Sequence, residues 1–186
     1  IRKRQEKRAY RAVSVILKAI GMTLLIFASI LPAIVFPQYE TIEVTGEYQV
    51  TTVTYTYTDT RRVETYTDMG EQRKLNVKLW YPKDADGRYP LIVFSHGSLG
   101  IKASNESLYN ELASHGYVVC AVDHRYQCLY TTDEHGQITL LDRGYMQELI
   151  NEDADFDRQQ SYEYYQKWMK IRTDDIDFVI DYILAE

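Results

Sequence analysis

The fold of this chain can be argued from the stretch Leu91-Ile92-Val93-Phe94-Ser95-His96-Gly97-Ser98. Four apolar residues in a row predict a strand that is buried on both faces, as in the middle of a sheet covered by helices. This strand leads directly into a small polar turn that contains glycine. Because open α/β sheets place their ligand sites at the carboxyl ends of the strands, we expect a functional site at this turn.

The residues after the turn predict a helix and a second buried strand. A capping stretch, Ser104-Asn105-Glu106, indicates the start of the helix, and Gly116 is typical of its end. Three apolar residues are predicted to form its inner face: Leu108, Leu112 and Ala113. The apolar run Tyr117–Val122 then predicts the second strand, parallel to the first in a mixed sheet.

Upstream of this unit, apolar and polar residues alternate in three segments, at 47–58, 61–67 and 74–81. Alternation with a period of two predicts strands that have one solvent-exposed face. The intervening Asp68-Met69-Gly70-Glu71 is typical of a turn. The sequence therefore predicts three antiparallel strands before the buried one.

Residues 126–157 have a weaker pattern and many acids, and we expect a lid-like insertion over the top of the sheet. Helical periodicity returns at Arg158. Its predicted apolar face consists of Trp168, Ile171, Ile176, Val179, Ile180 and Ile183. Its acids are placed mainly elsewhere: Asp174, Asp175, Asp177 and Asp181.

The amino-terminal part has the pattern of a membrane anchor. Residues 1–18 are a basic flank, and residues 19–37 form an apolar segment, uncharged from Ala19 to Phe36, that predicts a transmembrane helix. The positive-inside rule places the flank in the cytoplasm and the rest outside. A cleaved signal peptide and a buried core helix are the alternatives. Residues 38–46 are predicted to be a linker, and residues 47–186 to form a partial α/β domain.

Composition excludes some classes of protein. The net charge of −6 argues against a nucleic-acid-binding face. Cys120 and Cys128 form neither a zinc pattern nor a disulfide framework; Cys120 fits a core position, and a Cys120–Cys128 bridge is the alternative. Both ends of the chain have the appearance of the edges of a fragment.

Four segments together resemble the first half of an α/β-hydrolase. They are Phe94-Ser95-His96-Gly97, Glu111–Val119, Val122–Arg125 and Arg172–Asp181. The pattern is most similar to the platelet-activating-factor acetylhydrolase and dienelactone-hydrolase-like branches. The resemblance implies an antiparallel start to the mixed sheet, then the parallel unit, and ester hydrolysis by a Ser-His-Asp triad without metal or organic cofactor.

The same resemblance implies which part of the active site this sequence carries. It has no Gly-x-Ser-x-Gly, so the nucleophile, acid and base are expected beyond Glu186. One oxyanion-hole donor maps to the backbone N–H of Ser98, with Leu99 as the neighbouring candidate. His96 and Gly97 are expected to support this loop, the histidine as a hydrogen-bonding residue.

Other combinations of residues have weaker support. Ser98, His124 and Asp123 have the residue types of a catalytic triad, but most chains contain such a combination by chance, so the sequence gives it little support. A metal site from His124, Cys128 and His135 lacks a fourth ligand and a recognisable spacing. Four aromatic residues are equally consistent with an acyl pocket and with ordinary packing: Tyr162, Tyr164, Tyr165 and Trp168.

These patterns predict a membrane-anchored serine hydrolase of carboxylic esters, with acetyl and lipid esters among the candidates. Its partners would be a small-molecule or lipid ester and the bilayer around residues 19–36. The alternative is a non-catalytic or truncated α/β-hydrolase-like protein, anchored in the membrane and used for binding. In the family's sheet order, the strand at 91–95 would also have one unpaired edge in this chain.

Overall fold

The computed structural model describes residues 12–35, 42–84 and 86–185. The chain divides into two units, Ile1–Ile42 and Glu43–Glu186. Predictions for the basic flank up to residue 11, for residues 36 and 37, and for linker residues 38–41 lie outside the described part.

The described part of the first unit is one helix, α1 (Ala12–Val35). Its segment Ser14–Ile34 has a mean hydropathy of 2.2, and its length and composition would allow it to cross a membrane or to act as a signal sequence. The hydroxyls of Thr23 and Ser29 donate to main-chain carbonyls one turn earlier, at 3.0 and 2.8 Å. These two hydroxyls are therefore satisfied within the helix, as an apolar environment requires.

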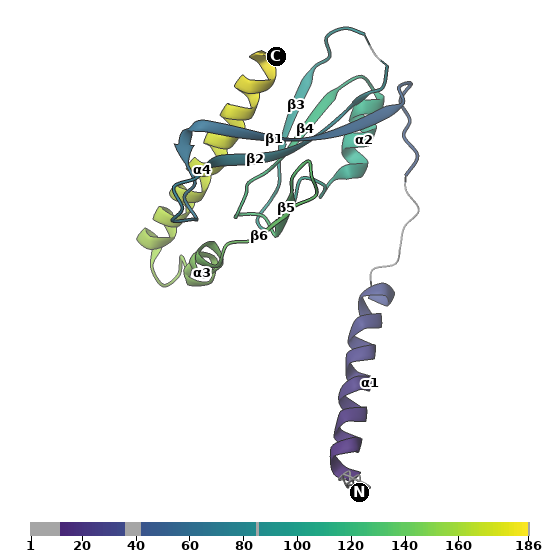
Figure 1. Cartoon of the computed structure of the whole chain (residues 1–186), viewed down its shortest axis with the longest axis vertical. Helices are drawn as coiled ribbons and strands as arrows, with labels where there is room; N and C mark the ends of the chain where they lie inside the picture. Colours follow the sequence, from purple (N-terminus) through teal and green to yellow (C-terminus); the bar gives the residue numbers. More distant parts are fainter. Residues whose placement is uncertain (1–11, 36–41, 85, 186) are drawn as a thin grey trace, which may run out of the picture. The chain divides into compact units, whose positions relative to one another are not determined.

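The second unit is built on a mixed four-stranded sheet with the order β1-β2-β4-β3 (Figure 1). The strands are β1 (Val50–Val63), β2 (Gln72–Pro82), β3 (Leu91–Ser95) and β4 (Val118–Asp123). β2 is antiparallel to β1 and β4, whereas β3 and β4 are parallel. Helix α2 (Glu106–Ser114) connects β3 to β4, which confirms the predicted strand–helix–strand unit.

Two predictions about the first strands are wrong. The segments 47–58 and 61–67 are largely one strand, β1, because no Gly or Pro interrupts them and a bulge between Asp59 and Val63 carries the ladder on to β2. In addition, β2 has no continuous solvent-exposed face. Its residues 75–77, 79 and 80 are buried, since helices lie on both sides of the sheet.

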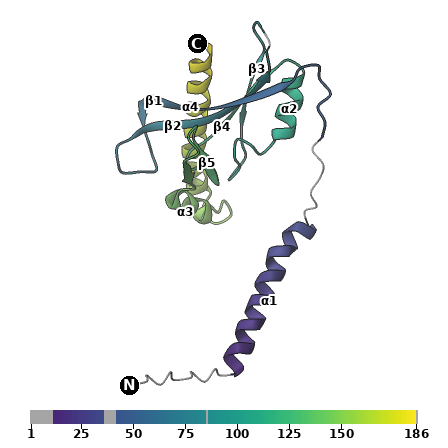
Figure 2. The ribbon, with the colours of Figure 1, turned by 45° about the vertical axis from the view of Figure 1, so that its right-hand side comes forward.

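Helices α2 and α4 (Arg158–Ala185) cover opposite faces of the sheet, as Figure 2 shows. On the α4 face, Phe178 and Val179 pack against Leu75, Val77 and Val122. On the α2 face, the core consists of Trp80, Tyr109, Ala113, Val119 and Ala121. This arrangement buries apolar residues on both sides of the sheet.

The inner face of α2 includes the predicted Leu112 and Ala113 but not Leu108. Tyr109 is fully buried between Trp80 and Phe94, with ring centroids 4.7 and 5.0 Å away, whereas Leu108 is 49% exposed. The helix is rotated so that the larger aromatic ring fills the space above the sheet. Gly116 has a φ of +88° and ends the helix as predicted.

Strand β3 is less buried than its sequence predicts. All five of its residues are half-buried, because among the described residues β3 pairs only with β4. The apolar run identified the strand but overestimated its burial, while the unpaired edge expected from the family's sheet order is confirmed among the described residues. The second face of such a run is covered only where another strand or helix lies against it.

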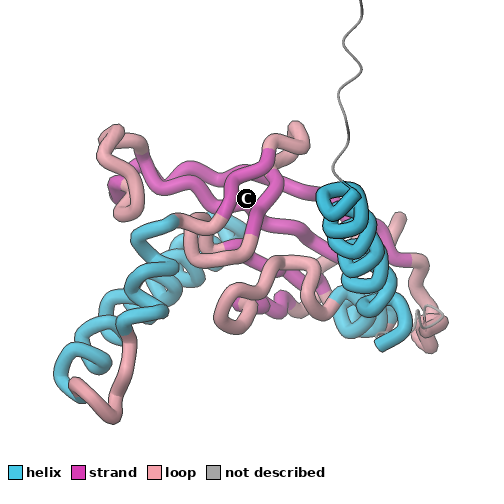
Figure 3. The backbone as a smooth tube through the Cα atoms, turned by 90° about the horizontal axis from the view of Figure 1, so that it is seen from below, coloured by secondary structure: helices cyan, strands magenta, loops and turns pink. Residues whose placement is uncertain are grey.

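Residues 126–157 form a small hairpin, β5 (Tyr130–Thr132) with β6 (Ile138–Leu140), and a short helix, α3 (Arg143–Asn151) (Figure 3). This segment is attached at the carboxyl ends of β3 and β4. Thr131 donates a hydrogen bond of 2.6 Å to Asp123, and Leu99 forms an isolated β-bridge with Cys128. The segment thus lies beside the turn that the sequence singled out.

Candidate functional site

The loop after β3 places two exposed residues, Gly97 and Ser98, next to the buried His96. The Gly100 N–H donates to the Gly97 carbonyl at 3.1 Å and closes the loop. The left-handed φ of +56° belongs to Leu99 rather than to Gly97. A Cβ at Gly97 would meet no atom within 4 Å. The structure therefore leaves open space above Gly97 and concentrates the backbone strain one residue after Ser98.

His96 links this loop to the end of β4. Its Nδ1 lies 2.7 Å from the Gly97 carbonyl, and its Nε2 lies 3.3 Å from the main-chain N–H of His124. The two contacts fit a neutral ring that donates through Nδ1 and accepts through Nε2. Burial lowers the pKa of His96 to about 4, although the Gly97 carbonyl acts in the opposite direction.

Arg172 of α4 fixes the same loop from the other side. Its Nη1 donates to the His96 carbonyl at 2.8 Å, and its Nε donates to the Gln127 side chain at 3.1 Å. The guanidinium is largely committed to the protein and buried. Arg172 thus holds the loop in place, a role that sequence reasoning did not assign to it.

The predicted donor, the Ser98 N–H, has no hydrogen-bond acceptor among the described residues. Leu99, the neighbouring candidate, has its backbone in the bridge to Cys128. An N–H without an intramolecular partner, in an exposed residue, can bind an anionic oxygen. Both residues stay candidates for the donor, because no hydrogen bond of the Leu99 N–H in the described part of the chain separates them.

A cavity of about 330 Å³ lies against Gly97 and Ser98. Its other walls come from α3, the residue that follows it, and α4, and consist of Tyr145, Leu149, Glu152, Tyr165, Trp168, Met169 and Arg172. Two of the four aromatic residues that the sequence singled out, Tyr165 and Trp168, are therefore among its walls. A largely apolar cavity beside one exposed donor has the character of a small-molecule site.

Below the loop lies a buried network of charges that the sequence analysis missed. Arg73 of β2 donates to both carboxylate oxygens of Asp175, at 3.1 and 2.7 Å, and to Glu64 at 2.8 Å. Arg62 lies 3.0 Å from Asp175. Burial alone would raise the pKa of Asp175, but the hydrogen bond from His124 and the charge of Arg73 outweigh it and lower the pKa to about 2.

The prediction that Asp175 lies away from the inner face of the helix is wrong. Asp175 is fully buried, while Ile171 and Ile176 are only half-buried. Trp168, Arg172, Asp175 and Val179 share one helical face, and all four are buried. Their spacing of four, three and four residues was a signal in the sequence, but charged residues were not considered for that face.

The structure does not assemble the trio of Ser98, His124 and Asp123. His124 instead lies between Ser95 Oγ, 2.8 Å from its Nε2, and Asp175 Oδ2, 2.9 Å from its Nδ1. Asp123 accepts hydrogen bonds from Lys102 and from Thr131. Asp123 therefore ties the residue 126–157 segment to the end of β4.

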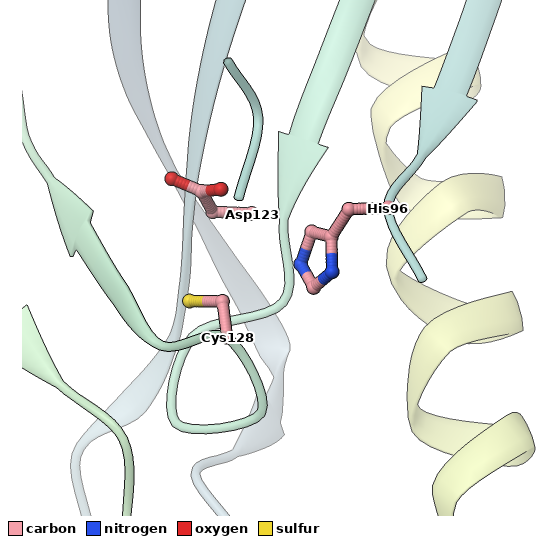
Figure 4. A group of neighbouring side chains, drawn as sticks. All are labelled: His96, Asp123 and Cys128. Atoms are coloured by element: carbon pink, nitrogen blue, oxygen red, sulfur yellow. The ribbon is translucent and has the colours of Figure 1, made fainter. Parts of the chain in front are cut away.

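Three buried side chains in the described part could in principle hold a metal ion: His96, Asp123 and Cys128 (Figure 4). Their donor atoms lie within 4.8 Å of one another. Asp123 already binds the Lys102 ammonium, which would repel a cation, and burial raises the pKa of the Cys128 thiol to about 12. His96 uses both ring nitrogens within the loop. This donor set does not fit a metal ligand sphere.

Two further alternatives from the sequence, a disulfide between the cysteines and a metal site that includes His135, can be judged from the environments of these residues. Cys120 and Cys128 are both free and buried, so the disulfide alternative is wrong. His135 is 74% exposed, whereas His124 and Cys128 are buried. The metal site suggested by these three residues is therefore not supported by their environments.

The sequence model of the family "Platelet-activating factor acetylhydrolase, isoform II" matches residues 36–138, which are more than half of the chain. The matched region includes all strands of the main sheet and the loop with Ser98. The platelet-activating factor acetylhydrolase of Cavia porcellus is 42% identical over 52 residues, 28% of this chain. That of Bos taurus is 47% identical over 38 residues, 20% of this chain.

The aligned stretches make up only 12% and 9% of these two relatives. This chain therefore matches a small part of the length of its curated relatives. Among solved structures, a ferulic acid esterase from Streptomyces cinnamoneus aligns with a TM-score of 0.48 and 22% identity. That alignment covers 54% of this chain and 40% of the esterase.

Proposed function

This chain belongs to the family of platelet-activating factor acetylhydrolase, isoform II, and we propose that it is the amino-terminal part of a membrane-anchored serine hydrolase of carboxylic esters. In this proposal the chain supplies one oxyanion-hole donor, the Ser98 N–H, and the walls of an acyl pocket. The observation that carries it is the N–H of an exposed residue, without a partner among the described residues, beside an apolar cavity and inside the family match.

The chemistry follows from the charge that develops during ester hydrolysis. Attack on the ester carbonyl places negative charge on its oxygen, and a preorganised N–H in a partly apolar cavity stabilises that charge. Holding this donor in a fixed loop costs no reorganisation during the reaction. The His96 ring and Arg172, which fix the loop, provide this preorganisation.

The nucleophile, acid and base are proposed to lie in sequence that follows Glu186. The fold places a Gly-x-Ser-x-Gly turn about one strand–helix unit after the parallel pair, and residues 1–186 lack this motif. The coding sequence should therefore contain it within about 15–35 residues of Glu186. Its absence there would refute the proposed enzyme.

The decisive experiment removes only the N–H of residue 98 in the full-length protein. A Ser98→Ala variant keeps the N–H, and replacement of Ser98 by lactic acid, through amber suppression, converts that amide to an ester. Hydrolysis of p-nitrophenyl acetate should fall about 10²–10³-fold in kcat for the ester variant relative to the Ser98→Ala variant. Loss of activity in Ser98→Ala itself would instead make the hydroxyl the nucleophile.

The proposal predicts that residues 1–186 alone do not hydrolyse esters. Purified residues 38–186, incubated with short p-nitrophenyl esters, should release p-nitrophenol no faster than buffer does. Catalysis that saturates with substrate would contradict the assignment of the triad to later sequence. It would also favour a nucleophile within the described part.

Helix α1 is proposed to anchor the protein, with residues 1–18 in the cytoplasm and the second unit on the other side. Its length and hydropathy support a span, and the basic residues near it lie on its amino-terminal side, since no Lys or Arg occurs from Ala19 to Thr60. Alkaline phosphatase fused after Gly46 should be active, and the fusion should resist carbonate extraction. A mature chain that begins after residue 37 would identify a cleaved signal peptide instead.

A further inference from the structure

Ser95, His124 and Asp175 form a hydrogen-bonded row directly below the proposed oxyanion loop. Ser95 Oγ lies 2.8 Å from His124 Nε2, and His124 Nδ1 lies 2.9 Å from Asp175 Oδ2. The three residues come from β3, the turn after β4 and α4. The order of these contacts is that of a hydrolytic Ser-His-Asp triad.

Burial argues against a catalytic role for this row. The side chains of His124 and Asp175 are completely inaccessible, so the imidazole has no path by which to give a proton to a leaving group. The cavity beside the loop is lined by Gly97 and Ser98 but not by Ser95. A general base must be within hydrogen-bond reach of the reacting group, which this geometry does not allow.

The contacts define where the protons lie. Asp175 is a carboxylate balanced by Arg73 and Arg62, so it accepts a hydrogen bond from Nδ1–H of His124. The other nitrogen, Nε2, then accepts the hydroxyl proton of Ser95. Burial lowers the pKa of His124, which keeps the ring neutral. The hydroxyl of Ser95 is thereby held in one orientation at the end of β3.

The same histidine also contacts the loop through its main chain. The N–H of His124 donates to His96 Nε2 at 3.3 Å, and the His96 ring contacts the carbonyl of Gly97, the residue before Ser98. Ser95 and His96 are adjacent in sequence, and both contact His124. Ser95 contacts the His124 ring, and His96 contacts the His124 main-chain N–H. A displacement of His124 would therefore move the loop that carries the Ser98 N–H.

We propose that Ser95, His124 and Asp175 are positioning residues that fix the Ser98 N–H for the ester carbonyl oxygen. The inference rests on the proposed function, because it assumes that Ser98 supplies an oxyanion donor. Two short hydrogen bonds, between Ser95 and His124 and between His124 and Asp175, hold the end of β3 in a fixed position relative to β4 and α4. None of the three residues touches substrate.

The kinetic test uses the full-length enzyme with p-nitrophenyl acetate. Ser95→Ala should lower kcat about tenfold and change KM less than about twofold, since a misplaced donor loses part of the roughly 10²–10³-fold effect of an oxyanion contact. Ser95→Thr, which restores a hydroxyl, should recover kcat to within about threefold. Ser107→Ala, at an exposed serine of α2, is the matched control and should be unchanged.

A second readout does not depend on activity. In ¹⁵N-labelled chain 1–186 in detergent micelles, the Ser98 amide resonance should shift in Ser95→Ala and return in Ser95→Thr. An unmoved Ser98 resonance in Ser95→Ala would overturn the inference. A shifted and rescued resonance supports it even if the full-length protein hydrolyses no ester, in which case only the proposed function fails.

A third experiment tests whether Ser95 is a nucleophile, since its contacts resemble those of a catalytic triad. A fluorophosphonate probe should leave Ser95 unlabelled in the full-length enzyme. Covalent labelling of Ser95, together with complete loss of hydrolysis in Ser95→Ala, would make Ser95 a nucleophile and overturn its role as a positioning residue.

Discussion

The middle of the sheet and the carboxyl ends of β3 and β4 both contain fully buried side chains, but of different kinds. In the middle, Leu75, Val77 and Val122 pack against α4, and Val119 packs toward α2. At the carboxyl ends, residues such as His96, Asp123, His124 and Gln127 are at most 2% exposed. One region excludes polar groups, while the other concentrates them.

The two regions therefore contribute differently: apolar burial stabilises the fold, and the buried polar contacts fix the position of hydrogen-bonding groups. Apolar burial stabilises the fold without fixing any hydrogen-bonding group, at roughly 25 cal/mol per Å². Buried ion pairs contribute little net stability, but their partners become costly when left alone. The polar region is therefore the part of the molecule in which single substitutions should have the largest effects, and in which donors are held in a fixed geometry.

The largest effect is expected for Asp175→Ala, which leaves Arg73 buried without its main partner. The free energy of unfolding should fall by about 3–5 kcal/mol. Urea unfolding of the full chain, followed by Trp fluorescence, measures this change. Asp177→Ala, at an exposed position of the same helix, is the control and should stay within about 0.5 kcal/mol. Equal losses of stability in Asp175→Ala and Asp177→Ala would contradict the view that the buried polar region is the most sensitive to substitution.

A core substitution in the middle of the sheet should follow. Leu75→Ala removes a fully buried side chain from the α4 face and should cost about 2–5 kcal/mol, through lost burial and the cavity left behind. Leu129→Ala, at a position 54% exposed, should cost much less. If Leu75→Ala is nearly neutral in the same unfolding experiment, the apolar region does not carry the stability assigned to it.

The third prediction concerns pH. The pKa of His96 is lowered to about 4 by burial, whereas an unfolded histidine titrates near 6.5. The unfolded chain therefore binds more protons between pH 6.5 and 4, and stability should fall as pH falls through that window, by up to about 1.4 kcal/mol per pH unit. His124, whose pKa burial also lowers, contributes with the same sign.

Urea unfolding at pH values of about 7, 6 and 5 tests this slope. His96→Gln should reduce it, because one of the two buried histidines no longer titrates. His135→Gln, at an exposed histidine, should leave it unchanged. An identical slope in His96→Gln and the unmodified chain would show that the loop histidine does not resist protonation.

The smallest effect is expected for an exposed ion pair. Lys170 lies 2.8 Å from Asp174 one turn away on α4, but its side chain is 75% exposed. Lys170→Met should change the free energy of unfolding by about 0.3–0.5 kcal/mol, because solvent screens the pair. A loss comparable to that of Asp175→Ala would contradict the view that burial decides the cost.

The elements around the loop after β3 could be predicted because their signals are local. The apolar runs at 91–95 and 117–122, with Gly116 between helix and strand, indicated the parallel unit that the register of β3 and β4 confirms. The errors have local causes as well. Alternation alone could not show that 47–58 and 61–67 are largely one bulged strand, nor that Tyr109 rather than Leu108 faces the sheet.

The assignment of Ser98 as candidate donor came from the family resemblance and stays a prediction. The contacts that hold its loop could not be predicted from the sequence. Arg172, which holds the His96 carbonyl, and the row from Ser95 to Asp175 involve residues that the sequence analysis placed in other roles or left without one. Hydrophobic periodicity says where a helix is buried only when the buried residues are apolar.

By itself, the sequence determined the parallel strand–helix–strand unit, the apolar character of α1 and the turn after β3. Those features depend on residues a few positions apart, whose side chains share one face of a strand or helix. Only the tertiary structure decided which charged groups meet. Arg73 and Asp175 are 102 residues apart, and their pairing follows from α4 lying against the sheet beside β2. A buried charge requires an opposite charge or hydrogen-bonding group beside it in the folded structure, and no local sequence pattern indicates which residue will lie there.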